Sequence, residues 1–132
     1  MGWRAMRIYK NAWFAKFALK ENILDGALFN AVARAQNGQI DADLGGGLLK
    51  QRIAREGFGK SGGFRTLLFF RSGDRAVFAF GFAKSDKSNL TKSELKEFKK
   101  AARLVLAFSQ VEIDALVETK QWMEVRYDSE NL

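Results

Sequence analysis

The residues best suited to chemistry in this chain are cations that gather in its middle part. Five of them fall on or between two strand-like segments, namely Lys50, Arg52, Arg55, Lys60 and Arg65. Two more lie at the end of the next such segment, which Lys84 ends and Lys87 follows. Lys50 and Arg52 are two residues apart, so they project from the same face of a strand. If these strands are neighbours, the cations converge on one groove that could stabilise charge developing on a phosphodiester.

Arg65 differs from the other cations because its sequence neighbours are apolar. It follows Phe64 and precedes Thr66-Leu67-Leu68. A guanidinium group in such a strand is usually held for a bidentate partner, such as a phosphate. We therefore expect Arg65 to hold the anion. The alternative is a structural arginine that pairs with a carboxylate in the sheet.

Residue types that the chain lacks exclude several kinds of active site. Among its 132 residues there is no cysteine and no histidine. Thiolate and imidazole metal ligands, cysteine nucleophiles and Ser-His-Asp triads are therefore excluded. We expect neither a metal nor another cofactor.

Cleavage of RNA by attack of its own 2′-hydroxyl group needs a base, an acid and a group that stabilises charge. Neighbouring cations favour a neutral amine, so Lys50 or Lys60 could be the base. Lys84 or Lys87 is the candidate acid. The carboxylate alternatives for the base are Glu56 and Asp86.

Two glycine-rich stretches could be taken for a nucleotide-binding loop and a metal site, but each has another interpretation. Gly57-Phe58-Gly59-Lys60-Ser61 resembles part of a phosphate-binding loop, but that motif needs a glycine where Ala54 stands and a helix directly afterwards. A strand-like segment follows, which excludes a nucleotide hydrolase but leaves open a loop that contacts nucleic-acid phosphates. The sequence Asp41-Ala42-Asp43 before Gly45-Gly46-Gly47 predicts a turn into the sheet rather than a metal site.

The net charge of +7 is unevenly distributed along the chain. Residues 48–75 carry seven basic and two acidic side chains, and residues 84–103 carry seven and three. Residues 104–132 carry two and six. A basic middle segment favours a polyanionic partner, nucleic acid first. A charged surface that only serves solubility is the alternative.

Local patterns predict the elements that position these cations. Residues 7–10 form a strand, and two helices follow as a hairpin, with Asn11 and Asp25 as N-caps and Gly38 after the second helix. Strands follow over 48–54, 63–71 and 75–84, the last two joined by the turn 72–74. In the third of these, strict alternation places Phe78, Phe80 and Phe82 on one face, as core residues.

Two capping boxes mark the start of later helices. Thr91 with Glu94 opens one helix, whose apolar stripe consists of Leu95, Phe98, Ala102 and Leu106, and Ser109 with Glu112 opens a shorter helix to about residue 117. The sequence over residues 122–126 predicts a final strand.

The order of these elements predicts an α+β fold in which helices are segregated on one face of an antiparallel sheet. Helices on one face of the sheet would leave the opposite face, or one edge, for function. We expect one domain over residues 1–132, with residues 1–5 as an N-terminal extension and 128–132 as a flexible tail. No apolar run approaches the roughly 18 residues of a membrane span, so we expect a cytoplasmic protein.

Several stretches together resemble the RelE-like toxins of bacterial type II toxin–antitoxin modules, and within the RelE/ParE superfamily a HigB-like branch. They are residues 40–48, 50–55, 59–66 and 80–84, together with Ile8-Tyr9-Lys10-Asn11 and Trp13-Phe14. The resemblance covers residues 6–118 and is most specific from Asp41 to Lys84. It implies a RelE-like microbial RNase-type fold, with an N-terminal helical hairpin packed on a small curved antiparallel sheet and a C-terminal helix. It implies in addition a ribosome-dependent endoribonuclease that cleaves translated mRNA. It also implies a cognate antitoxin, expected as a helix-turn-helix protein.

The resemblance also assigns roles to individual residues. Arg65 corresponds to the arginine that binds the scissile phosphate in RelE toxins, Lys50 and Arg52 to the strand with paired lysines, and Lys84 to the lysine that ends the next strand. Arg52, Arg55 and Lys87 are the expected RNA-binding cations. The chain has Ser85 where RelE has an arginine, and Thr91 where RelE has a tyrosine that stacks on mRNA. Alternatives are a ParE-like inhibitor of DNA gyrase that cleaves no RNA, and a module that binds RNA or the ribosome without cutting.

Overall fold

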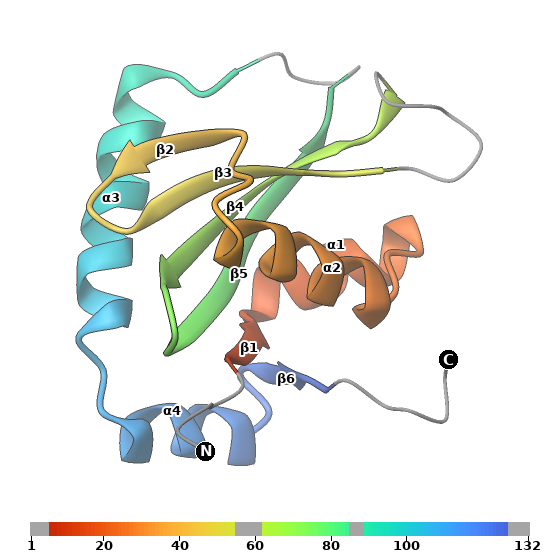
Figure 1. Ribbon diagram of the computed structural model, residues 1–132. Coiled ribbons are helices and arrows are strands. Elements are labelled where there is room, and N and C mark those ends of the chain that lie inside the picture. Colours follow the sequence, from red (N-terminus) through yellow and green to blue (C-terminus); the bar gives the residue numbers. More distant parts are fainter. Residues whose placement is uncertain (1–5, 55–61, 85–88, 127–132) are drawn as a thin grey trace.

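The computed structural model describes residues 6–54, 62–84 and 89–126. These residues form an α+β fold in which a six-stranded sheet has helices on both faces (Figure 1). The helices are α1 (Ala12–Glu21), α2 (Asp25–Gln36), α3 (Lys92–Leu106) and α4 (Gln110–Glu118). The strands are β1 (Arg7–Lys10), β2 (Ala42–Gly45), β3 (Leu48–Ile53), β4 (Phe64–Arg71), β5 (Arg75–Ala83) and β6 (Met123–Val125).

The sheet has the order β2-β3-β4-β5-β1-β6. The predicted α+β class is therefore confirmed. Within the described segments, no helix combines the length and the apolar composition needed to cross a membrane. The expected N-terminal extension and C-terminal tail lie outside the described residues, and the single domain stays a prediction.

The prediction of an antiparallel sheet is wrong at one strand. β1 runs parallel to β5, with Arg7 opposite Arg75 and Lys10 opposite Phe78. The other neighbouring strands in the described sheet pair antiparallel. Parallel neighbours need a long crossover, and here α1, α2 and three strands provide it. A four-residue strand carries no local signal of such a pairing.

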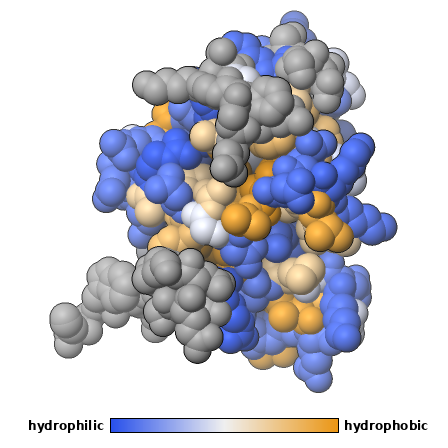
Figure 2. Space-filling view, turned by 90° about the vertical axis from the view of Figure 1, so that its right-hand side faces the viewer, coloured by the Kyte–Doolittle hydropathy of each residue, from blue (hydrophilic) through white to orange (hydrophobic). Residues whose placement is uncertain are grey.

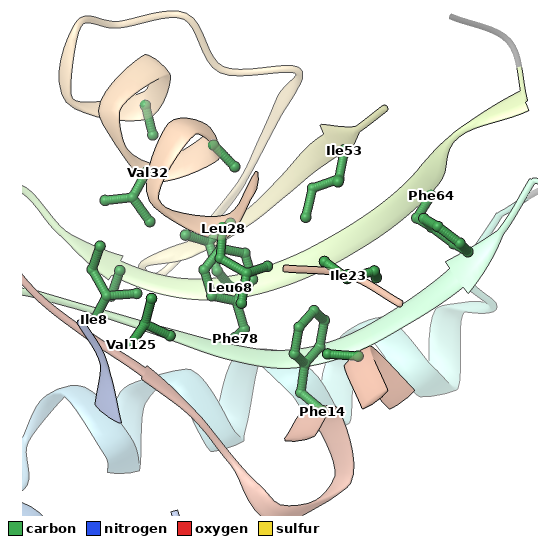
Figure 3. Packing of buried hydrophobic residues seen from close by; sticks show 14 of the residues in the cluster. Ile8, Phe14, Ile23, Leu28, Val32, Ile53, Phe64, Leu68, Phe78 and Val125 are labelled. Carbon is green, nitrogen blue, oxygen red and sulfur yellow. The ribbon is translucent and has the colours of Figure 1, made fainter. Parts of the chain in front are cut away.

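The prediction that the helices share one face is also wrong. α1 and α2 pack on one face of the sheet, the hairpin face, against a core that includes Phe14, Leu28, Leu68 and Phe78 (Figure 3). α3 and α4 pack on the other face, the α3 face, and the predicted apolar stripe of α3 does contact this second core. The reason is that β4 and β5 bury side chains on both sides, so both sides must be covered.

A β-bulge in β5 changes which side chains share a face. Leu67 lies opposite Phe80, but Leu68 lies opposite Phe78, so Ala79 is an extra residue. Phe78 therefore packs in the core of the hairpin face and Phe80 in that of the α3 face. The prediction that Phe78, Phe80 and Phe82 share one face is thus wrong for Phe78.

Asn11 links this bulge to the start of α1. Its side-chain oxygen accepts a hydrogen bond from the backbone N–H of Phe14 at 2.8 Å, as the predicted N-cap should. Its amide donates to the carbonyl of Ala79 at 3.2 Å, and its backbone N–H donates to the carbonyl of Phe78. One residue therefore caps the helix and binds two carbonyls at the bulge.

The other predicted caps have mixed outcomes. Both capping boxes, at Thr91 and Ser109, are present. The N-cap of α2 is Leu24 and not Asp25, because Asp25 is already helical and its carboxylate binds Lys10 at 3.0 Å. Gly38 follows α2 with a positive φ of 81°, as predicted.

The stretch predicted as a turn into the sheet forms an edge strand and a tight turn. β2 pairs antiparallel with β3, and Gly46 and Gly47 connect them with positive φ angles. A side chain at Gly47 would lie 2.4 Å from Leu106 of α3. Glycine is therefore needed here both for the backbone conformation and for the approach of α3.

Candidate nucleic-acid interface

Alternation along β3 places its two cations on the α3 face. Gln51, which lies between them, is fully buried on the hairpin face. Its amide donates to the carbonyls of Ala31 and Gln39, at 2.9 and 3.0 Å. Because neighbouring side chains of a strand point to opposite faces, this buried amide directs Lys50 and Arg52 to the α3 face. The predicted shared face of these two cations is confirmed.

The register of three strands then brings two arginines together. Arg52 of β3 lies opposite Arg65 of β4, and Arg65 lies opposite Phe82 of β5. Side chains at directly opposed positions of antiparallel strands have Cβ atoms about 5 Å apart. The α3 face therefore carries a pair of neighbouring guanidinium groups, and like charges in this position repel one another.

Nothing among the described residues neutralises this arginine pair. Neither guanidinium group forms an ion pair or a hydrogen bond with a described residue, although both side chains are partly buried. The Nε atom of Arg52 is buried without a hydrogen-bond partner. A buried donor without a partner is costly, and an anion bound between the two groups would supply the missing acceptors.

The backbone beneath the arginine pair is held firmly. The guanidinium group of Arg34 donates to the carbonyl of Arg52 at 2.6 Å. The carboxylate of Asp41 accepts from the backbone N–H of Arg52. The hydroxyl group of Thr66 donates to the carbonyl of Gln51 at 2.8 Å. Asp41 thus fixes β3, which is a structural role that its position before the glycines does not reveal.

Of the lysines predicted for the site, the structure describes two, and both lie towards the end of the sheet that carries this pair. Lys50 is two residues before Arg52, and its Nζ atom is 3.4 Å from the side-chain oxygen of Asn89. Lys84 is exposed and directly follows β5, beyond the pairing of Ala83 with Phe64. Lys84 therefore leaves the sheet at the same end as Arg65.

The remaining predicted residues lie outside the described residues. They are the cations Arg55, Lys60 and Lys87 and the carboxylates Glu56 and Asp86. Ala54 and Gly62 flank one of these segments, and Lys84 and Asn89 flank the other. Their roles stay predictions.

Thr91, which stands where RelE has a tyrosine, belongs to the start of α3. Its hydroxyl group accepts from the backbone N–H of Glu94 at 3.1 Å, and the carboxylate of Glu94 accepts from the backbone N–H of Thr91. The hydroxyl of Thr91 is therefore engaged in a helix cap.

Trp13, the second residue of α1, is 45% exposed. Phe14 and Ala18 supply the buried contacts of α1. Two clefts, of about 490 and 780 Å³, lie beside α2 and share Ala27 and Ala54 in their linings. Arg52 also lines the smaller cleft, together with Arg34 and Asp41, whereas Arg65 lines neither.

This arrangement of two arginines suits the binding of a phosphate group of a nucleic-acid strand. Arginine keeps its proton and offers a planar fork that matches phosphate oxygens. Two such forks on rigid neighbouring strands can hold one phosphate group in a fixed orientation. No group of three acidic side chains that could hold a metal ion occurs in the described part of the chain.

Comparison with known proteins gives one finding. A family model described as the RelE toxin of the RelE/RelB toxin–antitoxin system matches residues 6–125. This match spans the sheet, all four helices and the arginine pair. It does not single out a HigB-like branch. No curated protein matches the chain.

Proposed function

The chain belongs to the RelE toxin family of toxin–antitoxin systems, and from this we propose that it inhibits translation by cutting mRNA on the ribosome. Membership of the family implies an antitoxin partner. We further propose that this partner is a helix-turn-helix protein and that the toxin acts in the cytoplasm, where translated mRNA is found. The HigB-like branch is supported by the stretch from Asp41 to Lys84.

The observation that carries this proposal is the unpaired arginine pair. Arg52 and Arg65 face one another without a described counterion, and the Nε atom of Arg52 has no acceptor. A protein tolerates such repulsion most readily where a bound anion removes it. A phosphodiester of single-stranded RNA is an anion of the right charge and shape.

In the proposed mechanism, the arginine pair holds the scissile phosphate and stabilises the charge that develops on it. The 2′-hydroxyl group of the preceding ribose attacks the phosphorus, which yields a cyclic phosphate and releases the 5′-oxygen of the next nucleotide. Lys50, beside the pair, or Lys60 removes the proton of the attacking hydroxyl. Lys84 or Lys87 donates a proton to the leaving oxygen.

Primer extension on translated mRNA tests this proposal. Purified ribosomes carrying a defined mRNA are incubated with the protein, and the ends of the RNA are mapped. We expect cuts inside the ribosomal A site, and none with free mRNA. Inhibition of DNA gyrase without RNA cuts would instead support a ParE-like activity. Protection of the A site without new ends would support binding without cleavage.

A further inference from the structure

Aromatic rings continue the α3 face from the arginine pair towards α1. Phe82 lies opposite Arg65. The ring of Phe80 is 6.1 Å from that of Phe82 and 4.5 Å from that of Trp13, measured between ring centroids. Trp13 also stacks on Phe17 at 5.2 Å, with 18° between the ring planes. These contacts form an aromatic array that leads from Trp13 through Phe80 to Phe82, the residue opposite Arg65; Phe82 is only 6% exposed, and Phe80 also packs on Phe98 of α3 at 5.2 Å.

The sheet topology explains how Trp13 reaches this array. β1 ends at Lys10, opposite Phe78, so the second half of β5 has no described strand on that side. The chain turns into α1 at once, and Trp13 is the second residue of this helix. The bulge at Ala79 points Phe80 to the α3 face, where Trp13 meets it at the open edge of β5.

The exposure of Trp13 is not needed to hold α1 in place. The next residue, Phe14, is fully buried in the core of the hairpin face. Trp13 keeps 45% of its surface in solvent. Hydrophobic surface lies among hydrophilic side chains on the side of the molecule that is shown in Figure 2. Aromatic rings connect this half-exposed side chain to two arginines that have no counterion among the described residues. Single-stranded nucleic acids bind such surfaces because bases stack on aromatic rings while cations bind phosphates.

We propose that Trp13 is a base-stacking residue that binds a nucleobase of the RNA strand whose phosphate lies on Arg52 and Arg65. This inference rests on the proposed function and deepens it by naming where a base is held. Phe82, opposite Arg65, and Phe80 are two residues apart on β5, roughly 7 Å along the strand. A single strand that crosses β5 can therefore place one phosphate on the arginine pair and a base farther along the strand on Trp13.

Binding of a short single-stranded RNA tests the inference. The full chain is titrated against a fluorescent oligonucleotide whose 2′-O-methyl groups prevent cleavage, and anisotropy gives Kd at several salt concentrations. For Trp13→Leu we expect binding roughly 5- to 150-fold weaker, as for the loss of one stacked base. The dependence of Kd on salt should stay unchanged, because no charge is lost. Trp13→Phe should restore part of the affinity.

The matched control is Leu19→Ala, in the same helix. The side chain of Leu19 is 82% exposed, and it is not part of the aromatic array. It should leave Kd unchanged. Thermal unfolding of each variant identifies any loss of fold. A second test changes the RNA. Replacing the stacked base by an abasic site should weaken binding to the natural chain but not to Trp13→Leu.

The outcomes separate this inference from the proposed function. If Arg65→Gln weakens RNA binding and reduces its salt dependence while Trp13→Leu and the abasic site change nothing, the stacking role is wrong and the phosphate role stands. If Trp13→Leu weakens only the capture of the antitoxin, the indole is a protein contact and the inference is overturned. If the natural chain binds no RNA, both proposals fail.

Discussion

Two arginines on opposed positions of neighbouring strands repel one another unless an anion lies between them. This pair has consequences for stability as well as for binding. Removal of either charge takes away the repulsion, so the folded state should lose little without ligand. A structural arginine paired with a carboxylate would behave in the opposite way, because its removal would leave a buried charge unpaired.

Arg65→Ala should therefore retain its fold and lose activity. We expect a loss of roughly 100- to 1000-fold in cleavage rate, from about 2.7–4 kcal/mol of lost transition-state stabilisation. Arg65→Lys should restore only part of the rate, since a point charge does not reproduce the planar fork. Melting temperature and cleavage rate are measured on the same preparations. A destabilised Arg65→Ala protein with full activity per folded molecule would contradict the phosphate role.

Arg71→Ala is the matched control for charge. Arg71 ends β4, six residues after Arg65, and binds the carboxylate of Asp74 at 2.7 Å and the carbonyl of Leu106. Its removal should leave the cleavage rate nearly unchanged. A small loss of stability is expected, because Leu106 is the last residue of α3.

Tyr9 gives the protein a sensitivity to alkaline pH. Burial raises the pKa of Tyr9 above its ordinary value of 10.0, an effect that the hydrogen bond from Gln110 and the charge of Arg7 partly oppose. A folded-state pKa above the unfolded value means that the contribution of neutral Tyr9 is present below about pH 10 and is lost as the pH rises through the folded-state pKa.

Tyr9→Phe isolates this effect. At about pH 8 the variant should be less stable by about 0.5–1.5 kcal/mol, because the hydrogen bond with Gln110 is lost. The difference in free energy of unfolding between the two proteins should shrink towards about pH 11. Urea unfolding at both pH values measures it. A difference that does not change with pH would show that Tyr9 does not ionise in the folded protein in this range.

At the scale of the residue, sequence reasoning singled out Arg65 but did not place it opposite Arg52. Arg65 could be predicted because an arginine among apolar residues is unusual in a strand. Its position opposite Arg52 depends on the register of two strands, which hydrogen bonds of Gln51, Thr66 and Asp41 determine. Such contacts between distant residues have no local pattern in the chain.

Secondary-structure elements followed their local patterns wherever the stabilising contacts are themselves local. The capping boxes of α3 and α4 and the turn between β4 and β5 were predictable for this reason. The bulge in β5 was not, because Asn11, 68 residues before Ala79, binds its carbonyl. The parallel pairing of β1 with β5 likewise joins residues far apart in the chain and was missed.

Asn11→Ala should therefore cost more than the loss of a helix cap. The variant loses the cap of α1 and leaves the carbonyl of Ala79 without its amide donor, for a total of about 1–3 kcal/mol. Thr91→Ala, which loses a cap alone, should cost about 0.5–2 kcal/mol. Asn11→Asp keeps an acceptor for the backbone N–H of Phe14 but loses the donor to Ala79. Its stability should therefore lie between that of the natural chain and that of Asn11→Ala. Equal costs for Asn11→Ala and Thr91→Ala in urea unfolding would contradict a role for Asn11 at the bulge.

At the scale of the whole molecule, charge is separated along the chain. Residues 48–75 and 84–103 are strongly basic, whereas residues 104–132 are acidic. The basic segments supply β3, β4 and α3, and the acidic segment supplies α4 and β6, next to the far edge of the sheet. A partner with acidic segments would be attracted to the cationic side, which increases the rate of capture.

The association rate with the antitoxin should therefore fall as salt rises. From about 0.05 M to about 0.5 M ionic strength, screening shortens the reach of the charges, so the rate should decrease steadily while dissociation changes less. Stopped-flow mixing of toxin and antitoxin measures both rates. A rate of association that is independent of salt would contradict capture on the cationic face, though not the partnership itself.

The pairing of β1 on both of its sides bears on when the protein becomes active. β1, at residues 7–10, pairs with residues 75–78 on one side and with residues 123–125 on the other. A chain leaving the ribosome from its N-terminus cannot complete these contacts until residues 123–125 have emerged, and contacts between such distant residues form slowly. Because Asn11 and Trp13 take their positions from β1, the contact of Trp13 with Phe80 is completed late, whereas Arg52 and Arg65 come together once β3 pairs with β4. In this interval a partner already present can meet a newly made copy before its aromatic array is complete.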